Sequence, residues 1–319
     1  MKKIVLLSMS FFGYEEIIRT KIEELGNKCQ LVKSEPRFSM FDSLCKKFDK
    51  NRYVSKTLFY IHNVVKEIHE CDELIIIFSP NLSQEAIAVF RKKFPKVNVT
   101  YYIWDSVNNF PNVLKIAKGC DRVLSFDRND CMKYGFEFLP LFYSDNTKLE
   151  CKKEFDYSMI FSIYPSKVKN YEMLRKAIPK SKIGYTHIYV PSKMFYYYQL
   201  FYPVFRAVKH SDVKSYALPK ETVYDTFRKS LVTIDCPLES QSGLTMRTFE
   251  ALSMGIKLVT TNKDIANYNF YSSDNIFIVD KEHNEIPDEF FNSPFDYSYD
   301  MSDYSLESFV NRLMGNAKR

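Results

Sequence analysis

Several patterns that mark common protein classes are missing from this chain of 319 residues. Its seven cysteines are odd in number and lack paired short spacings, which argues against a disulfide framework and against a zinc site. No apolar run approaches the roughly 18 residues that a bilayer-spanning helix needs. The loop after the first predicted strand has one glycine and no G-x-G-x-x-G pattern, so an NAD or FAD site is weakly supported. We therefore expect a cytoplasmic chain without a transmembrane segment.

Charge is present but not concentrated. The formal net charge is +6 at pH 7, and no basic run or tail accounts for it. This balance suits phosphate-bearing substrates or an anionic membrane surface, and it does not indicate a nucleic-acid partner. Hydrophobic residues make up 45% of the chain, which is enough for a large core, and the length favours two domains.

Buried-strand and amphipathic-helix patterns alternate along the chain. It begins with a predicted strand at 3–7, a helix at 14–25 and a strand at 29–32, and the alternation restarts at residue 157. This is typical of Rossmann-like α/β domains. We predict two such domains facing each other across a cleft. They are an N-terminal domain at 1–150 and a C-terminal domain at 151–300, followed by a last helix at 301–319 that can return to the first domain.

One stretch, at 233–262, has the pattern of a ligand site. A predicted strand at 231–235 is followed by a loop of small and polar residues, a helix at 245–254 and a second strand at 257–261. The loop leads into a helix N-terminus, where unpaired backbone N–H groups and the helix dipole favour phosphate or another anion.

Two charged residues of that predicted helix strengthen the ligand interpretation. Arg247 places a positive charge in the first turn, where the helix dipole disfavours it, and a bound anion facing Arg247 would explain this. Glu250, one turn further on, is then within reach of sugar hydroxyls. A diphosphate with an attached ribose fits both features. The alternative is that both residues are ordinary surface charges of an α/β protein.

The same stretch resembles the donor-binding region of GT-B glycosyltransferases. The pattern is Ser242-Gly243-Leu244, then Phe249-Glu250-Ala251-Leu252, then Met254-Gly255-Ile256-Lys257-Leu258-Val259. With Trp104-Asp105-Ser106 and the segment 125–143, it is similar to bacterial glycosyltransferases of capsule and lipopolysaccharide biosynthesis, over residues 100–280. One departure is Ser242, where many GT-B families have a Glu near the reacting sugar; Glu239 is the nearest substitute.

The resemblance implies GT-B architecture and sugar transfer from a nucleotide-sugar donor to a hydroxyl of a bacterial surface glycan, such as capsule, lipopolysaccharide or O-antigen. The nucleotide sugar is a co-substrate, and no cofactor or metal ion is implied. The acceptor, a glycan or lipid-linked oligosaccharide, is expected on the first domain, at the loop Ser10, Phe12 and Gly13. The expected donor-binding residues are Ser242, Gly243, Leu244, Thr245, Arg247, Glu250, Asn262 and Lys209, with Arg247 also stabilising the leaving diphosphate.

Two predicted strands of the first domain end in chemically useful residues. The strand at 97–103 leads to Trp104 and Asp105, and the strand at 122–126 leads to Asp127. Because the carboxyl ends of parallel strands face the ligand crevice, Asp105 or Asp127 can act as general base on the acceptor hydroxyl. Trp104, the only tryptophan, suits stacking on the acceptor sugar. The alternatives are a core position for Trp104 and a helix cap at Asp105.

The segment 193–210 is rich in aromatic residues and flanked by basic ones. One interpretation is an interfacial segment that rests on the inner face of the cytoplasmic membrane, near lipid-linked acceptors. The other is an aromatic-rich core helix. Lys209, at the end of the segment, is also a candidate to reach the donor's diphosphate.

Two other functions stay open at this point. Ser242 is consistent with a GT-B-like nucleotide-sugar-binding protein that has lost catalysis. A nucleotide-sugar epimerase of the same fold also places carboxylates in such a cleft, and it acts on the donor without an acceptor.

Overall fold

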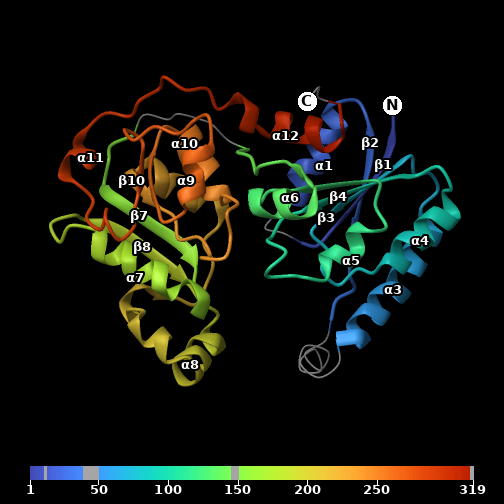
Figure 1. Cartoon of the computed structure of the whole chain (residues 1–319), viewed down its shortest axis with the longest axis horizontal. Helices are drawn as coiled ribbons and strands as arrows, with labels where there is room; N and C mark the ends of the chain where they lie inside the picture. Colours follow the sequence, from blue (N-terminus) through green and yellow to red (C-terminus); the bar gives the residue numbers. More distant parts are fainter. Residues whose placement is uncertain (11–12, 39–49, 145–150, 317–319) are drawn as a thin grey trace. The chain divides into compact units, whose positions relative to one another are not determined.

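The computed structural model describes residues 1–10, 13–38, 50–144 and 151–316, which form two compact units (Figure 1). Unit 1 contains Met1–Pro140 and Leu306–Arg319, and unit 2 contains Leu141–Ser305. The sequence had placed the first boundary about ten residues later, at 151, and the second about five residues earlier, at 301. At the base of unit 2, Tyr143 N donates to Tyr304 O over 2.9 Å, and Tyr143 forms a parallel bridge with Ser305. The segments that enter and leave unit 2 therefore lie side by side.

Unit 1 is built on a six-stranded sheet in the order β2-β1-β3-β4-β5-β6, with every pairing parallel. The strand order reverses between β1 and β3. The strands are β1 (Lys3–Ser8), β2 (Lys28–Lys33), β3 (Glu73–Ile77), β4 (Asn98–Ile103), β5 (Arg122–Ser125) and β6 (Glu137–Phe138). The helices are α1 (Tyr14–Glu24), α3 (Lys50–Glu67), α4 (Gln84–Lys93), α5 (Val113–Ala117), α6 (Arg128–Tyr134) and α12 (Leu306–Leu313).

Burial on both faces explains why the strands of unit 1 are nearly continuous apolar runs. All five residues of β3 are buried. Successive side chains point to opposite faces of a strand. Val5 and Leu7 pack in a core cluster with residues of α3, α4 and α5. On the other face, Tyr102 of β4 packs against Phe309 of α12, with ring centroids 5.1 Å apart. A sheet covered on both faces in this way is typical of doubly wound α/β folds.

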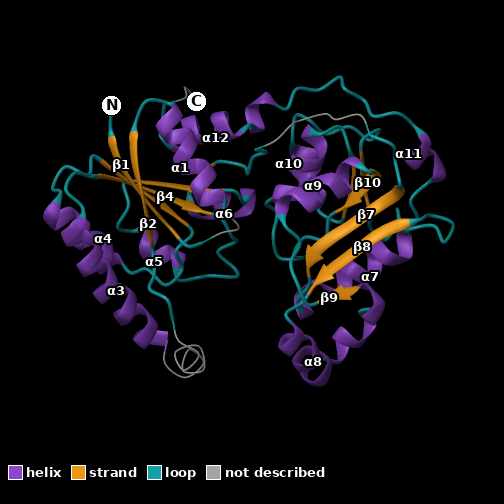
Figure 2. Ribbon diagram, turned by 180° about the vertical axis from the view of Figure 1, so that it is seen from behind, coloured by secondary structure: helices purple, strands orange, loops and turns teal. Residues whose placement is uncertain are grey.

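Unit 2 repeats the design with the order β12-β11-β10-β7-β8-β9, again with every pairing parallel (Figure 2). Here the order reverses between β7 and β10. The strands are β7 (Phe155–Ser162), β8 (Gly184–Tyr189), β9 (Val213–Lys214), β10 (Ser230–Ile234), β11 (Lys257–Thr260) and β12 (Ile276–Ile278). The helices are α7 (Val168–Ala177), α8 (Ser192–Phe201), α9 (Lys220–Arg228), α10 (Met246–Ser253) and α11 (Asp288–Asn292).

Helices cover both faces of the second sheet as well. Residues of α7 pack with β7, β8 and β10 in one cluster, and residues of α9 and α10 pack with Ile160 of β7 in another. Short 3-10 turns connect these elements: η1 (Pro165–Lys167), η2 (Pro203–Ala207), η3 (His210–Asp212), η4 (Lys263–Asn267) and η5 (Ser302–Tyr304). The prediction of an α/β fold with two Rossmann-like domains is confirmed.

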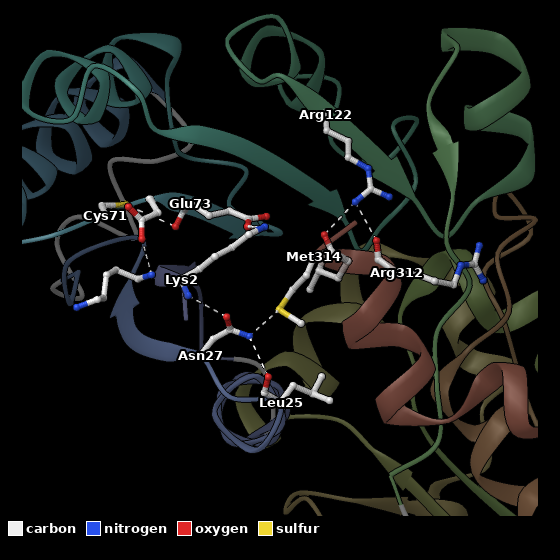
Figure 3. A network of polar contacts seen from close by, with 11 residues as sticks. Lys2, Leu25, Asn27, Cys71, Glu73, Arg122, Arg312 and Met314 are labelled. Atoms are coloured by element: carbon white, nitrogen blue, oxygen red, sulfur yellow. Dashed lines mark hydrogen bonds and ion pairs between the residues drawn. The ribbon is translucent and has the colours of Figure 1, made fainter. Parts of the chain in front are cut away.

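The last helix, α12, is part of unit 1, and an arginine caps its C-terminus (Figure 3). Arg122 Nη1 donates to the carbonyls of Arg312 and Leu313, over 2.8 and 3.0 Å. Its Nε and Nη2 bind both carboxylate oxygens of Glu137, over 3.0 and 2.8 Å. The terminal carbonyls of a helix lack intrahelical partners and favour a positive charge, so Arg122 stabilises this end of α12.

The shortest strand of unit 1 is one that the sequence does not reveal. The two-residue strand β6 was not predicted, because so short a segment has no readable period. In the part of the chain that the structure describes, no helix combines the length and the apolar character needed to cross a membrane.

Candidate functional site

The candidate site lies in unit 2, where the strand order reverses. In open parallel sheets, ligands bind outside the carboxyl ends of the two strands that flank such a switch point. These strands are β7 and β10, which pair in parallel from Ser230↔Phe155 onward. The loop after β7 ends in η1 at Lys167, and the loop after β10 runs from Asp235 to Thr245.

The loop after β10 contacts both η1 and the first turn of α7. Asn170 Nδ2 donates to Pro237 O over 3.0 Å, and Cys236 Sγ donates to Lys167 O over 3.8 Å. Further out, Lys169 forms an exposed ion pair with Glu239. Glu239, the nearest substitute for the missing first Glu of the GT-B pattern, is therefore engaged at the surface of this loop pair.

A buried carboxylate, Asp235, stands at the centre of the site. It follows β10 directly, and its Oδ2 accepts a hydrogen bond from Thr245 Oγ1 over 2.9 Å. Burial raises the pKa of Asp235 above its ordinary value, while Lys167, Arg247 and the Thr245 hydroxyl act in the opposite direction. Both cations are thus near enough to act on one buried carboxylate, although Lys167 lies on η1 after β7 and Arg247 on α10 after β10.

Arg247 is the second residue of α10 and is half-buried. Its Nε is buried and has no hydrogen-bond partner among the described residues. Leaving a buried donor unsatisfied costs about 1–3 kcal/mol, and more for a charged group. The first turn of α10 contains no acidic residue, and Thr245 makes no side-chain cap because its hydroxyl is used on Asp235. The N-terminus of this eight-residue helix is therefore positive on two counts, from its dipole and from Arg247.

The loop in front of α10 is fixed by Asn262, which follows β11. Asn262 Nδ2 donates to the carbonyls of Ser242 and Gly243, over 3.0 and 3.3 Å. Its Oδ1 accepts from Asp264 N over 3.0 Å and so caps η4. Asn262 positions the loop through its backbone carbonyls, while Leu244, the next loop residue, is buried. Direct contact of Ser242, Gly243, Leu244, Thr245 or Asn262 with a donor stays a prediction.

Glu250 lies on α10 and is only 3% exposed. Tyr224 of α9 donates from its hydroxyl to Glu250 Oε1 over 2.9 Å. The Tyr224 hydroxyl lies 3.4 Å from Ser144 Oγ, which accepts from Lys220 Nζ over 2.7 Å. This chain of hydrogen bonds fixes the orientation of the Glu250 carboxylate, which sequence reasoning did not anticipate.

Lys209 is exposed and precedes η3. Its backbone N donates to the hydroxyl of Tyr171 on α7 over 3.3 Å, so this segment is anchored to α7. The loop contacts described above involve Lys167 and Lys169 instead. A role for Lys209 on a diphosphate stays a prediction.

In unit 1, Trp104 is 6% exposed and packs within an aromatic cluster. Its ring centroid lies 5.9 Å from Tyr14, 5.7 Å from Tyr102 and 6.3 Å from Phe309. These contacts correspond to the core position that the sequence allowed as an alternative. Stacking of Trp104 on an acceptor sugar stays a prediction.

The three aspartates after β4 and β5 have different environments. Asp127 is buried and is the N-cap of α6, accepting from Asn129 N and Asp130 N over 3.0 and 3.2 Å. Asp130, on α6, accepts through Oδ2 from Val107 N over 2.7 Å and ties this helix to the loop after β4. Burial raises the pKa of Asp130.

Asp105 is the half-buried member of this group. Its Oδ1 accepts from Ser106 N over 2.7 Å and from Asn109 Nδ2 over 2.8 Å. It caps no α-helix, because the next one, α5, has Asn112 at its N-cap position. The loop after β1 was the other acceptor-side prediction. There, Ser10 and Gly13 are exposed, Gly13 precedes α1 with φ of 81°, and Phe12 lies outside the described residues.

Lys167, Asp235 and Tyr224 are the site residues that sequence reasoning missed. Lys167 lies at the end of the loop that follows β7, so the carboxyl-end rule could have selected it. Asp235 was predicted only as the last residue of a strand, and Tyr224 of α9 has no sequence pattern that points to the site.

Comparisons with known proteins add to this picture. No protein-family profile and no curated protein sequence matches the chain. Solved structures do match over nearly its whole length. UDP-GlcNAc 2-epimerase from Methanocaldococcus jannaschii, in complex with UDP-GlcNAc and UDP, has a TM-score of 0.55 at 10% identity, covering 99% of this chain and 100% of that one. The chain has the GT-B fold.

Two further structures support this conclusion. A glycosyltransferase from Rickettsia africae matches with a TM-score of 0.54 at 11% identity, covering 99% of this chain and 94% of its own. The α,α-trehalose 6-phosphate synthase from Burkholderia multivorans matches with a TM-score of 0.56 at 12% identity, covering 99% and 93%. At these identities the likeness establishes the GT-B fold and leaves the activity to the chemistry of the site.

Proposed function

We propose that this chain is a metal-independent glycosyltransferase that moves a sugar from a nucleoside diphosphate sugar to a hydroxyl of a bacterial surface glycan, of the capsule, lipopolysaccharide or O-antigen kind. The observation that carries this proposal is the buried, unpartnered Nε of Arg247 at the N-terminus of α10. A diphosphate oxygen would satisfy that donor in a place where the helix dipole also favours negative charge.

Lys167 and Arg247 would hold the diphosphate from two sides. As the bond between the anomeric carbon and the diphosphate oxygen breaks, its electron pair stays on the diphosphate. Cations placed where this charge develops lower the barrier. Glu250, oriented by Tyr224, would accept hydrogen bonds from the ribose hydroxyls of the donor. The resemblance to GT-B donor regions supports the same role for Glu250.

The acceptor hydroxyl oxygen would attack the anomeric carbon and pass its proton to a carboxylate of unit 1. We place this general base on Asp105, because Asp127 is buried and already accepts two backbone N–H groups as a helix cap. Ser10, Gly13 and Trp104 remain the proposed acceptor side. A general base in such a position contributes about 10²–10⁴ to the rate.

A thermal-shift screen of the full chain against UDP, GDP, CMP, ADP and dTDP tests the donor site. One nucleotide should stabilise the chain, by about 2.7 kcal/mol when its concentration is 100 times its Kd. Arg247→Ala and Glu250→Ala should each lose that stabilisation. Arg206→Ala, which changes an exposed arginine of the same unit, should keep it. Stabilisation that survives in both site variants would remove the assignment of this loop.

An epimerase is the second candidate, because a structure of UDP-GlcNAc 2-epimerase has the same fold. NMR of the nucleotide sugar after incubation with the chain separates the two activities. Inversion of a sugar carbon without an acceptor would identify an epimerase, whereas a new glycosidic bond that forms only with an acceptor identifies the transferase. Nucleotide binding with neither product would indicate a binding protein, consistent with Ser242.

We also propose that the chain works in the cytoplasm, at the inner face of the cytoplasmic membrane, where lipid-linked acceptors are presented. The mild positive charge and the aromatic segment around α8 support this location.

A further inference from the structure

The segment formed by α8 and η2 has a large exposed apolar face. Leu200 is 70% exposed and Tyr196 is 68% exposed, and both lie on α8. Exposed apolar side chains occur singly on most protein surfaces, but a group on one element indicates an interaction surface. We call this group the α8 face; it consists of Met194, Tyr196, Leu200, Phe201, Tyr202 and Val204.

The opposite side of the same segment is firmly packed. Phe195, Phe205 and Val208 are buried in the core of unit 2. The segment ends at Asp212, whose Oδ2 accepts from Tyr171 over 3.1 Å and lies 3.4 Å from Arg175 Nε. The α8 face therefore cannot turn inward without removing buried side chains from the core. It is a fixed platform at the margin of unit 2 (Figures 1 and 2).

The segment that carries the α8 face has charge of one sign. Residues 192–211 contain no Asp or Glu. Arg206, Lys209 and His210 are exposed on η2 and just after it. The first carboxylate beyond them, Asp212, is buried and engaged with Tyr171 and Arg175. This arrangement complements a negatively charged surface.

The chemistry of the side chains favours a bilayer over a protein partner. Tyrosines with an apolar ring and a polar hydroxyl are enriched at the membrane interface. Basic residues next to them pair with anionic headgroups, and aliphatic residues enter the boundary with the acyl chains. The α8 face and its flanking cations contain all three kinds.

We propose that the α8 face docks on an anionic lipid bilayer, with Leu200, Phe201 and Tyr196 inserted at the boundary between headgroups and acyl chains. Arg206 and Lys209 contact the headgroups. This inference rests on the proposed function, because docking on a bilayer would bring the chain to a lipid-linked acceptor. Its test is independent of nucleotide binding.

Co-sedimentation of the full chain with vesicles tests the docking. The probes are vesicles of phosphatidylcholine alone and of phosphatidylcholine mixed with phosphatidylglycerol. The chain should bind the anionic vesicles, and salt should weaken the binding because it screens exposed charges. The double variant Leu200→Ser with Phe201→Ser should lower the partition coefficient about tenfold or more, since both changed side chains would insert. Arg206→Gln should weaken binding to anionic vesicles only.

Two matched control variants replace equally exposed apolar residues outside the α8 face. Phe59→Ser, at 70% exposure in unit 1, and Ile183→Ser, at 68% in unit 2, should bind vesicles as the unchanged chain does. The unfolding transition without any ligand should stay cooperative in all variants, which shows that they fold and keeps this test separate from that of the donor site.

Three results would overturn the docking proposal. The first is absence of binding to either kind of vesicle. The second is equal loss of binding in the controls and in the double variant. The third is a halved molar mass of the double variant in light scattering, because the α8 face would then join two copies of this chain.

Discussion

Both units are doubly wound parallel sheets, but their strand orders differ, and so does the chemistry at the carboxyl ends of their strands. In unit 2, the carboxyl ends of β7 and β10 carry Lys167 and Arg247 around the buried Asp235. In unit 1, the corresponding reversal lies between β1 and β3, and the loop after β3 begins with an aromatic residue, Phe78. Its ring packs against Phe110 with centroids 5.0 Å apart. Carboxylates, including Asp105, follow the neighbouring strands.

Phe78 also shows that the two edges differ in backbone strain. It is the one non-glycine residue with positive φ, 31°, among those that the structure describes. Such a backbone conformation costs about 1–3 kcal/mol and persists where the surroundings hold it. Here Phe78 N donates to Tyr102 O over 3.0 Å. The edge of unit 1 is thus rigid, aromatic and acidic, while that of unit 2 is cationic and polar.

This difference suggests a division of labour. A departing diphosphate needs cations and N–H donors, and a hydroxyl that must lose its proton needs a carboxylate. Two doubly wound units can each offer one of these sets through the residues that follow their strands. The predictions below test whether the two sets can be separated.

The largest effect is expected at the edge of unit 1. Asp105→Asn should lower kcat about 10²–10⁴-fold, because the general base is lost, and leave the Kd of the donor unchanged. Steady-state kinetics with the donor selected by the screen measure both. If Asp127→Asn produces this loss and Asp105→Asn does not, the general base is Asp127. If neither affects kcat, unit 1 does not supply the base.

In unit 2, Arg247→Ala should weaken donor binding. Loss of a hydrogen bond from a charged group costs about 1.5–3 kcal/mol, which predicts roughly 10- to 150-fold weaker binding of the nucleoside diphosphate. Calorimetric titration measures this Kd, with Arg206→Ala as the control. An unchanged Kd in Arg247→Ala would contradict a cationic donor site in unit 2.

The pH dependence of donor binding should follow Asp235. Its pKa in the folded chain is raised by burial, so its ionisation costs stability as the pH rises through that pKa. A bound diphosphate adds negative charge nearby and raises the pKa further. Donor affinity should therefore increase as the pH falls through the pKa of Asp235. The increase is about tenfold for each unit by which the bound diphosphate raises that pKa. In Asp235→Asn, donor affinity should vary less with pH. If the unchanged chain and Asp235→Asn have the same pH profile, Asp235 does not affect donor binding.

The smallest effect is expected at the support of Glu250. Tyr224→Phe removes one hydrogen bond to the carboxylate, worth about 1 kcal/mol, or roughly fivefold in the Kd of a ribonucleotide. The matching 2′-deoxyribonucleotide should lose less. Tyr216→Phe, at an exposed tyrosine of unit 2, is the control. Equal losses for both sugars would mean that Tyr224 supports the fold rather than ribose binding.

The sequence allowed the fold to be predicted from local features. Strands buried on both faces, such as β3, have apolar runs that need no knowledge of their neighbours, and the loop before α10 has readable turn and helix-start residues. The pairing of β7 with β10 has no such local pattern. For that reason Arg247 was found, while its companion Lys167, on a loop far away in the sequence, was not.

Side-chain environments were harder to predict than elements. For Trp104 the sequence allowed both sugar stacking and a core position, and it could not show that Tyr14 and Phe309, from α1 and α12, lie near its ring together with Tyr102. In the same way, whether Asp127 or Asp130 caps α6 depends on where that helix starts, and boundaries are set within one or two residues by tertiary contacts.

The most direct test of the account compares a nucleoside diphosphate with its nucleoside. Calorimetric titration would use the diphosphate selected by the screen and the same nucleoside without phosphates, on the unchanged chain and on Lys167→Ala. If the loops after β7 and β10 hold the diphosphate, Lys167→Ala weakens binding of the diphosphate about tenfold or more and leaves nucleoside binding unchanged. The account would be contradicted if the unchanged chain and Lys167→Ala bound the diphosphate equally well. It would also be contradicted if Lys167→Ala lost the same affinity for the diphosphate and for the nucleoside.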